Sequence, residues 1–171
     1  AISIIKNKKF KITDISSKVT NRNPSGPFTT STLQQTASSR LGFGASRTMQ
    51  IAQKLYQGIE INGETIGLIT YMRTDGTNLS NDAVSAFRNY IKKEIGNEYL
   101  PNNALNYSGK KAKNAQEAHE AIRPTDIIRT PQSVKKYLSP DQNKLYDLIW
   151  CRALSSQMEA AKFDRNTITI S

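Results

Sequence analysis

The sequence predicts a mainly α-helical fold with a minor β component, and three observations carry this prediction. Helix start and stop signals bracket several stretches between residues 31 and 161. Both ends of the chain, residues 2–20 and 163–171, are instead β-branched or alternate polar with apolar residues, which is typical of strands. Asn62-Gly63 separates two short extended runs, as in a tight hairpin. We expect the two terminal strands to pair with each other or with protein outside this sequence.

The first helical stretch follows a loop predicted at residues 21–27, which is rich in Asn, Pro and Gly. Ser31 and Gln34 have the spacing of a capping box and would begin the first helix. Gly42 would end that helix. Residues 45–57 then predict a second helix, because apolar side chains recur there at helical spacing.

A hairpin predicted over residues 59–70 follows the two helices. This order of elements resembles a winged-helix or CAP-like module, a fold that often binds DNA. The suggestion depends only on order and spacing.

A third helix is expected from Ser80, a good N-cap, to Gly96. Residues 97–114 contain Pro, many Asn and a cluster of lysines, which predicts a surface loop. Residues 115–122 predict a short helical turn that Pro124 would stop.

The last helices have the clearest start signals. Thr130-Pro131 predicts a short helix that ends near Leu138. Ser139, Pro140 and Gln142 then combine an N-cap, a proline in the first turn and a capping box. They predict a long helix to about Ala161, followed by the terminal strand.

The composition favours an anionic partner. The chain has 24 Lys and Arg against 14 Asp and Glu, a formal charge of +10, and most of the excess precedes Tyr71. This balance is typical of proteins that bind nucleic acid or anionic membranes, although lysines that only keep a protein soluble would give the same count.

The remaining composition excludes several classes of site. One cysteine, Cys151, excludes an internal disulfide, and with a single histidine, His119, it excludes a Cys/His zinc site. No apolar run approaches the length of a membrane span, and the first residues have the reverse order of a signal peptide. We therefore expect a soluble, cytoplasmic protein with no membrane partner.

The run GLITYMRTDG, residues 67–76, places a hydroxyl nucleophile two residues before a fixed positive charge. On an extended backbone Tyr71 and Arg73 would point to the same face. A free tyrosine is almost wholly protonated at neutral pH, so a nucleophilic Tyr71 would need help from a base, a metal or a cation. Arg73 cannot act as a base, but it can hold the oxygens of a phosphodiester. The alternative is an ordinary strand-end tyrosine beside a surface charge.

A second candidate group lies in EAHEAIRPT, residues 117–125. Within it, HEAIR at residues 119–123 begins like the zinc-binding pattern HExxH, but Arg123 stands where the second histidine would be. His119 could contact a phosphate, Asp75 or Tyr71, in a pH-sensitive way. Arg123 could contact another phosphate. The alternative is a surface helical turn.

A third candidate group mixes hydroxyls and cations over residues 27–56, where helices are predicted to begin. Hydroxyls and helix N-termini commonly contact phosphates without reading sequence. Arg40 and Arg47 are its candidate DNA contacts. Ordinary helix capping would explain the same hydroxyls.

Five segments occur together in an order that resembles bacterial type IA DNA topoisomerases: PFTTSTLQQ, LGF with its following helix, GLITYMRTD, TNLS and AQEAHEAIRPT. The resemblance covers roughly residues 24–165. One difference is that the family usually has serine where this chain has Gly76, which removes a hydroxyl and frees the backbone.

The resemblance implies a function. In this family the tyrosine cuts one DNA strand through a transient 5′-phosphotyrosine, which relaxes negative supercoils without ATP. It assigns Tyr71, Arg73 and His119 as catalytic residues, and Arg73, Thr74 and Asp75, with Arg123, Arg40 and Arg47, as DNA contacts. No metal ligands are expected in this sequence. Mg²⁺ is expected in an N-terminal domain of the full enzyme, so the isolated chain would have little or no activity.

The resemblance also implies partners and a domain division. Residues 1–27 and 161–171 would be strands of a β-rich arch domain, and residues 28–160 the helical, tyrosine-bearing domain. The partners would be single-stranded and negatively supercoiled DNA and the other domains of the same polypeptide, in a monomer associated with the nucleoid. Two alternatives remain open: a non-catalytic winged-helix-like DNA-binding module, and a structural or partner-binding domain whose charge is incidental.

Overall fold

The chain divides into two compact units in a computed structural model that describes residues 9–107 and 119–171. One unit comprises Ala1–Asn23 with Ala160–Ser171, and the other comprises Pro24–Glu159. The mainly helical content with a few strands agrees with the predicted fold class.

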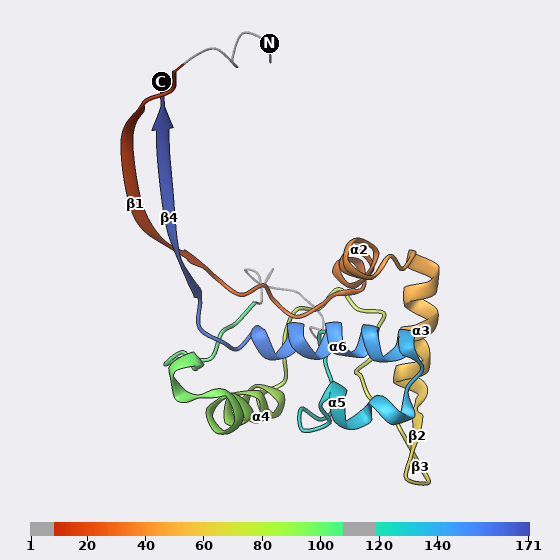
Figure 1. Ribbon diagram of the computed structural model, residues 1–171. Coiled ribbons are helices and arrows are strands. Elements are labelled where there is room, and N and C mark those ends of the chain that lie inside the picture. Colours follow the sequence, from red (N-terminus) through yellow and green to blue (C-terminus); the bar gives the residue numbers. More distant parts are fainter. Residues whose placement is uncertain (1–8, 108–118) are drawn as a thin grey trace, which may run out of the picture. The chain divides into compact units, whose positions relative to one another are not determined.

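The first unit is a two-stranded antiparallel ribbon of β1 (Ile12–Arg22) and β4 (Ala161–Ile170) (Figure 1). Their register runs from the pair Ile12 and Ile170 to the pair Arg22 and Ala161, with a bulge between Ile12 and Asp14. Of the two pairings expected for the terminal strands, with each other or with protein outside this sequence, the structure shows the first. All described residues of both strands are exposed except Thr20, which is half-buried, so neither face of the ribbon is covered.

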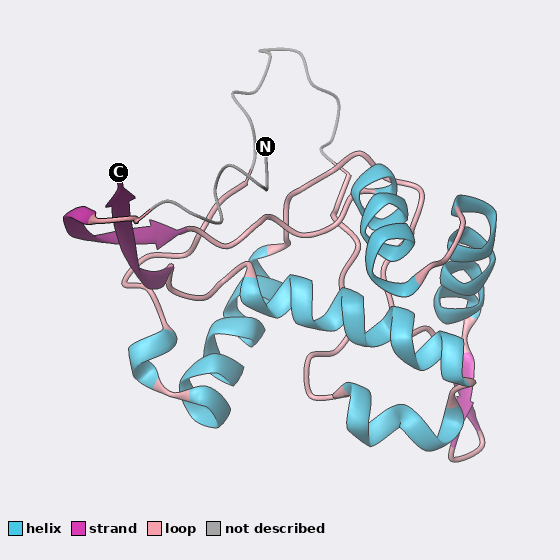
Figure 2. Ribbon diagram, turned by 45° about the horizontal axis from the view of Figure 1, so that its top comes forward, coloured by secondary structure: helices cyan, strands magenta, loops and turns pink. Residues whose placement is uncertain are grey.

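The second unit is built around one long helix. Figures 1 and 2 show α6 running through its middle, with α2 and α3 against one side and α4 and α5 along the other. Its helices and strands are α2 (Thr30–Leu41), α3 (Ala45–Gln57), β2 (Ile59–Ile61), β3 (Glu64–Ile66), α4 (Asn81–Tyr90), α5 (Pro131–Val134) and α6 (Pro140–Ser155). A π-helical turn, Ile91–Ile95, extends α4, and 3₁₀ turns occupy Asn97–Tyr99 and Lys135–Tyr137.

Two apolar clusters hold this unit together. The larger joins α2, α3 and α6 through fully buried side chains that include Leu33, Leu55 and Ile149. It also buries Leu68 and Ile69, which are followed in the chain by Thr70 and Tyr71. The smaller cluster packs α4 against the C-terminal half of α6. Burial of a whole Leu or Ile side chain contributes about 1.5–3 kcal/mol to the free energy of folding. The burial of Leu68 and Ile69 in this core therefore fixes the segment before Tyr71.

The helix boundaries follow their caps, with two differences from the sequence prediction. α2 begins at Thr30 because Thr29 and Thr32, rather than Ser31 and Gln34, form the capping box. α6 begins at the predicted Ser139 capping box but ends at Ser155, not near 161. The chain must be extended from Ala161 onward because it pairs with β1 there. α3 has the predicted bounds, and Gly42, at a φ of 69°, ends α2.

The predicted hairpin is present but shorter than expected. Asn62 and Gly63 both have positive φ, 53° and 89°, as a tight two-residue turn between β2 and β3 requires. The pairing ends at Ile66, opposite Ile59. The chain then leaves the hairpin, because Leu68 N–H donates to Leu55 O (2.8 Å) at the end of α3. A winged-helix arrangement stays a prediction.

The predicted helical turn at residues 115–122 is wrong for the part that the structure describes. Residues 119–122 are extended and form bridges with two distant segments, Glu120 beside Asn78 and Ile122 beside Phe28. Their backbone donors are used there, since Ala121 N–H donates to Asn78 O and Ile122 N–H to Phe28 O. Residues 115–118 and the lysine cluster at Lys110, Lys111 and Lys113 lie outside the described residues. Among the helices that are described, none has the length and apolar content needed to cross a bilayer.

Candidate active site around Tyr71

The segment that leads into Tyr71 is held by backbone hydrogen bonds on both sides. Thr70 N–H donates to Arg123 O (2.9 Å), and Thr125 N–H donates to Leu68 O (3.0 Å). The Thr70 hydroxyl donates to Ala121 O (2.7 Å) and accepts from Arg123 N–H (3.0 Å). Residues 67–70 are therefore fixed between the end of α3 and the extended segment 119–125.

The segment after Tyr71 is held by one hydroxyl at the start of α2. The Thr30 hydroxyl lies 2.7 Å from Met72 O and 3.1 Å from Thr74 O, and it accepts from Thr74 N–H (2.8 Å). Thr30 N–H also donates to Thr74 O (2.9 Å). Thr30 thus fixes the backbone on both sides of Arg73.

The side chains from Tyr71 to Asp75 alternate between solvent and core. Met72 is fully buried and Thr74 is 7% exposed, whereas Tyr71, Arg73 and Asp75 are exposed. Tyr71 does not end a regular strand, as the sequence suggested, since the backbone bends at residues 72–73. The alternation nevertheless places the hydroxyl nucleophile candidate and the cation on the outer side of one fixed segment.

Tyr71 is braced by a second tyrosine. Its ring packs edge-on against Tyr56 at the C-terminal end of α3, with the centroids 5.3 Å apart and the planes at 62°. Tyr71 remains 50% exposed. This contact restrains the ring of a residue that is half exposed.

Arg73 lines two surface hollows. One, of about 550 Å³, combines Arg73 with Thr74, Asp75 and His119 and with the start of α2 (Thr29, Thr30 and Ser31). His119 Nδ1 lies 3.6 Å from Asp75 Oδ1, and both side chains are largely exposed. The Thr29 and Thr30 hydroxyls are used within the protein, by Thr32 and by Met72 and Thr74. Ser31, at the N-terminus of α2 and beside the arginine, is the hydroxyl residue of this hollow best placed for a phosphate group. The structure thus brings four of the predicted site residues together.

The second hollow, of about 720 Å³, extends from Arg73 along α3 and is lined by cationic and amide side chains, among them Arg47, Gln50 and Lys54. Arg47 forms an ion pair with Asp141 and lies over the Phe43 ring at 4.8 Å. Arg47 is therefore within the same surface as Arg73, but its charge is partly neutralised.

Arg123 is placed differently. Its guanidinium binds the Glu120 carboxylate through two contacts, Nε to Oε1 at 2.6 Å and Nη2 to Oε2 at 3.1 Å, and it donates to Pro124 O. The side chain is only 14% exposed. Burial raises the pKa of Glu120, but hydrogen bonds from Arg123 and Ser80 outweigh it, so the net pKa is lowered. Arg123 thus braces the 119–125 segment from within, and Glu120 connects that segment to Ser80.

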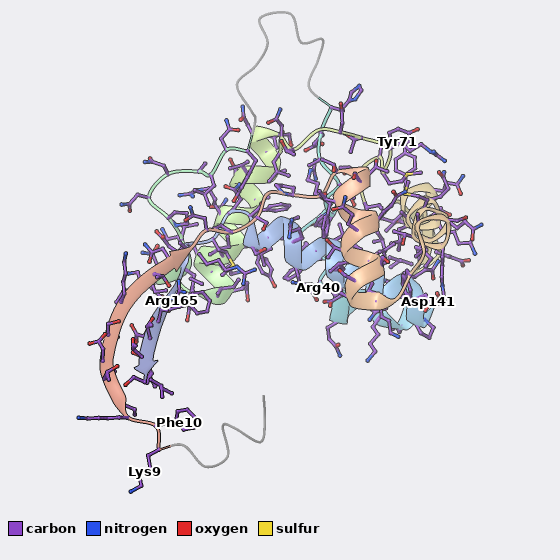
Figure 3. All side chains as sticks on the ribbon, turned by 90° about the horizontal axis from the view of Figure 1, so that it is seen from above. Lys9, Phe10, Arg40, Tyr71, Asp141 and Arg165 are labelled. Carbon is purple, nitrogen blue, oxygen red and sulfur yellow. The ribbon has the colours of Figure 1, made fainter. Side chains whose placement is uncertain are left out.

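Arg40 lies away from this site. Tyr71 and Arg40 are near opposite ends of α2 in Figure 3, and Arg40 is in the last turn of that helix. Its charge instead acts on Arg152, whose pKa is lowered by burial and then by Arg40. The geometry separates Arg40 from the other candidate DNA contacts.

Gly76 allows the two halves of the site to approach closely. A Cβ at this position would lie 1.7 Å from His119 O, a distance that no side chain tolerates. Serine in place of Gly76 would require the 119 segment to move away. In this chain Gly76 thus lets the Arg73–Asp75 turn lie directly against His119.

Metal ligation finds little support in the described residues. Residues 9–107 and 119–171 contain no cluster of three or more His, Cys, Asp or Glu that could hold an ion. Asp75 and His119 alone supply too few ligands for a dedicated Mg²⁺ site.

Sequence reasoning missed the residues that position the site. Thr30, Tyr56 and Glu120 each act through contacts with distant segments: Thr30 with residues 72–74, Tyr56 with Tyr71, and Glu120 with Ser80 and Arg123. The hydroxyl-rich start of α2 was the only available signal, and it indicated phosphate contacts and capping without a tertiary partner.

The whole chain, residues 1–171, matches the sequence model of a DNA topoisomerase family. DNA topoisomerase 1 of Rickettsia felis is 55% identical over 160 residues, which cover 94% of this chain and 20% of that protein. The Haemophilus influenzae protein of the same name is 48% identical over 170 residues, 99% of this chain and 18% of its own length.

A solved structure of the same family resembles this chain along almost its whole length. Full-length topoisomerase I from Thermotoga maritima superposes with a TM-score of 0.82 and 40% identity, covering 99% of this chain and 26% of that one. The chain thus spans about a fifth of the length of the curated relatives it matches. A family match over every residue and these relatives show that the chain belongs to the bacterial type IA DNA topoisomerase family.

Proposed function

We propose that this chain carries the tyrosine with which a type IA DNA topoisomerase cuts one DNA strand and relaxes negative supercoils. One observation carries the proposal: Tyr71 and Arg73 project outward from a segment whose backbone is fixed by the core and by Thr30. A nucleophile held in this way needs little reorganisation to meet a phosphodiester, and such positioning contributes strongly to catalysis.

The proposed step is a transesterification. The Tyr71 hydroxyl oxygen attacks the phosphorus, the bond from phosphorus to the 3′ oxygen breaks, and the tyrosine keeps the 5′ phosphate. The tyrosine proton is lost, and the departing 3′ oxygen takes up a proton. The reverse reaction rejoins the strand. One phosphoester bond forms as another breaks, so no ATP is required.

The residues around Arg73 would hold the phosphate. Arg73 can bind its non-bridging oxygens and offset charge that develops in the transition state. Thr74, Asp75 and His119 border the same hollow, with the start of α2 opposite. We propose His119 as a supporting site residue and Arg47 as an outer DNA contact along α3. Arg40 is exposed in the last turn of α2 and would contact DNA away from this hollow, whereas Arg123 would first have to release Glu120.

The rest of the enzyme would complete the site. Membership of the family implies that Mg²⁺ would be held by an N-terminal domain of the full-length protein. We therefore expect the isolated chain to show little or no cleavage. The ribbon would belong to an arch domain, and the partners would be single-stranded and negatively supercoiled DNA and the other domains of a monomeric, nucleoid-associated enzyme.

The test is covalent trapping on single-stranded DNA by the intact enzyme that contains this segment. Tyr71→Phe removes only the hydroxyl and should abolish the covalent adduct, while Tyr56→Phe, its exposed packing partner, should retain it. An adduct that survives in Tyr71→Phe would remove Tyr71 as the nucleophile. Arg73→Lys keeps the charge but loses the forked geometry, so we expect a drop of about 10²-fold in cleavage rate.

A further inference from the structure

The two faces of the β1–β4 ribbon differ in chemistry. From the bulge onward, the even-numbered residues of β1 and the odd-numbered residues of β4 share one face, because directly paired residues point to the same side. We call this the cationic face. The opposite face carries the apolar pairs Ile12–Ile170 and Ile15–Ile168. Hydrophobic burial against other protein would therefore use the apolar face and leave the cationic face available.

The cationic face places like charges directly opposite each other. Lys18 pairs with Arg165 in the register, and Arg22 lies two same-face positions beyond Lys18 on β1. Among the paired residues 14–22 and 161–169, Asp14 is the one carboxylate on the cationic face. Across residues 9–107 and 119–171, no carboxylate forms an ion pair with any of the three cations.

This arrangement costs stability in the free chain. Like charges at directly opposed positions destabilise a sheet, and a two-stranded ribbon is only marginally stable by itself. An anion bound over Lys18 and Arg165 would remove the repulsion. The cross-strand pair is thus better suited to a bound phosphate than to bare solvent.

An aromatic ring lies between the cations. Phe163 is 50% exposed and pairs with Thr20 on the cationic face. On this face, the Thr20–Phe163 pair lies between the Lys18–Arg165 pair and the Arg22–Ala161 pair. Hydroxyl residues, Ser16 opposite Thr167, continue the face on the other side of the Lys18–Arg165 pair. Cations alternating with an exposed ring are the combination with which proteins bind single strands, since every unpaired base can stack on an aromatic face.

We propose that the cationic face of the ribbon binds single-stranded nucleic acid, with phosphates on Lys18, Arg165 and Arg22 and a base stacked on Phe163. A duplex would offer the phosphates but not the free base. This surface is separate in sequence from Tyr71, takes no part in strand cleavage and does not depend on the function proposed for that residue.

The test is photo-crosslinking of the 171-residue chain to a thymidine oligomer that carries 5-iodouracil, followed by peptide mapping. We expect a crosslink at Phe163, with at least tenfold less product when the oligomer is annealed to its complement. Arg165→Gln should lower the yield about threefold at moderate salt, as expected for loss of one phosphate contact. Lys162→Gln, on the same strand but the apolar face, should leave the yield unchanged.

Two control measurements test whether the ribbon stays folded and whether crosslinking depends on Tyr71. Amide exchange in β4 should be at least as slow in Arg165→Gln as in the parent chain, because the like-charge pair is removed, and this excludes loss of the ribbon as the cause. Tyr71→Phe should crosslink at Phe163 as the parent does. The proposal is overturned by absence of product within 161–170, by equal yields with duplex, or by equal losses in Arg165→Gln and Lys162→Gln.

Discussion

The Tyr71 segment and the β1–β4 ribbon both display side chains to solvent, but they are supported in opposite ways. Residues 67–76 lie on a buried core and exchange backbone hydrogen bonds with α2, α3 and the 119–125 segment. The two strands of the ribbon bond to each other and bury neither face. Exposure of a side chain therefore does not reveal how firmly its backbone is held.

The difference matters for what each region can do. A nucleophile must meet one atom within a fraction of an ångström, so it requires a frame that is already ordered. A surface that binds a flexible strand through charge and stacking tolerates motion. The rigid frame around Tyr71 and the coreless ribbon match these two requirements.

The largest effect on stability is expected at Gly76, where the Tyr71 segment lies too close to His119 O for a side chain. Gly76→Ser places a Cβ against His119 O and should lower the free energy of unfolding of the helical unit by about 3 kcal/mol. The measurement is urea unfolding followed by the fluorescence of Trp150. Gly44→Ser is the control, because Gly44 has open space, a φ of −62° and an N-cap position that favours serine. Equal midpoints for both variants would contradict the close approach at Gly76.

The next effect concerns the ion pair behind the site. Arg123→Met leaves the half-buried Glu120 carboxylate without its main partner and should cost about 2 kcal/mol at neutral pH. The pKa of Glu120 is lowered in the folded protein, so its stabilisation is present above the ordinary glutamate pKa and is lost as the pH falls through the lowered value.

The difference in stability between the parent chain and Arg123→Met should therefore shrink as urea titrations move from pH 7 toward pH 3. The control is Arg129→Met, which breaks the ion pair of Arg129 with Asp126. This pair has the same i, i+3 spacing as Glu120–Arg123 but is more exposed, so its loss should lower the free energy of unfolding by less than about 1 kcal/mol. A pH-independent difference in Arg123→Met would show that packing, not the ion pair, supports this segment.

A direct contrast between the two regions uses one substitution twice. Thr30→Val removes a hydroxyl that bonds the backbone at Met72 and Thr74, so we expect a loss of about 1–2 kcal/mol in the helical unit. Thr20→Val removes a long, exposed bond to Phe163 O (3.4 Å) in the ribbon and should change amide exchange there very little. Similar losses at both positions would remove the contrast.

The smallest effect is a gain in the ribbon. Arg165→Glu converts the like-charge pair with Lys18 into an opposite-charge pair and should stabilise the ribbon by about 0.2–1 kcal/mol. Slower amide exchange in β1 and β4 at low salt, and loss of the gain at high salt, are the expected results. Lys162→Glu, opposite the uncharged Asn21, is the matched control.

Local signals predicted most of the fold. Gly42 ended a helix, Asn62-Gly63 made a turn, and Ser80, Thr130 and Ser139 began helices, because the chemistry of a cap or turn resides within a few residues. The capping box of α2 was misplaced by two residues, but the larger failures came where a distant partner decided the conformation. Residues 119–122 are extended because Asn78 and Phe28 take their backbone groups, and α6 stops early because β4 must pair with β1.

The same division applies to the site. The spacing of Tyr71 and Arg73, the excess of positive charge and the resemblance to type IA topoisomerases could all be predicted, since they are properties of residue order. Three further features appear once the chain is folded: Thr30 fixes the segment, His119 lies beside Asp75, and Arg123 is bound to Glu120. Contacts across tens of residues depend on how the core packs, and no local pattern of residues encodes that.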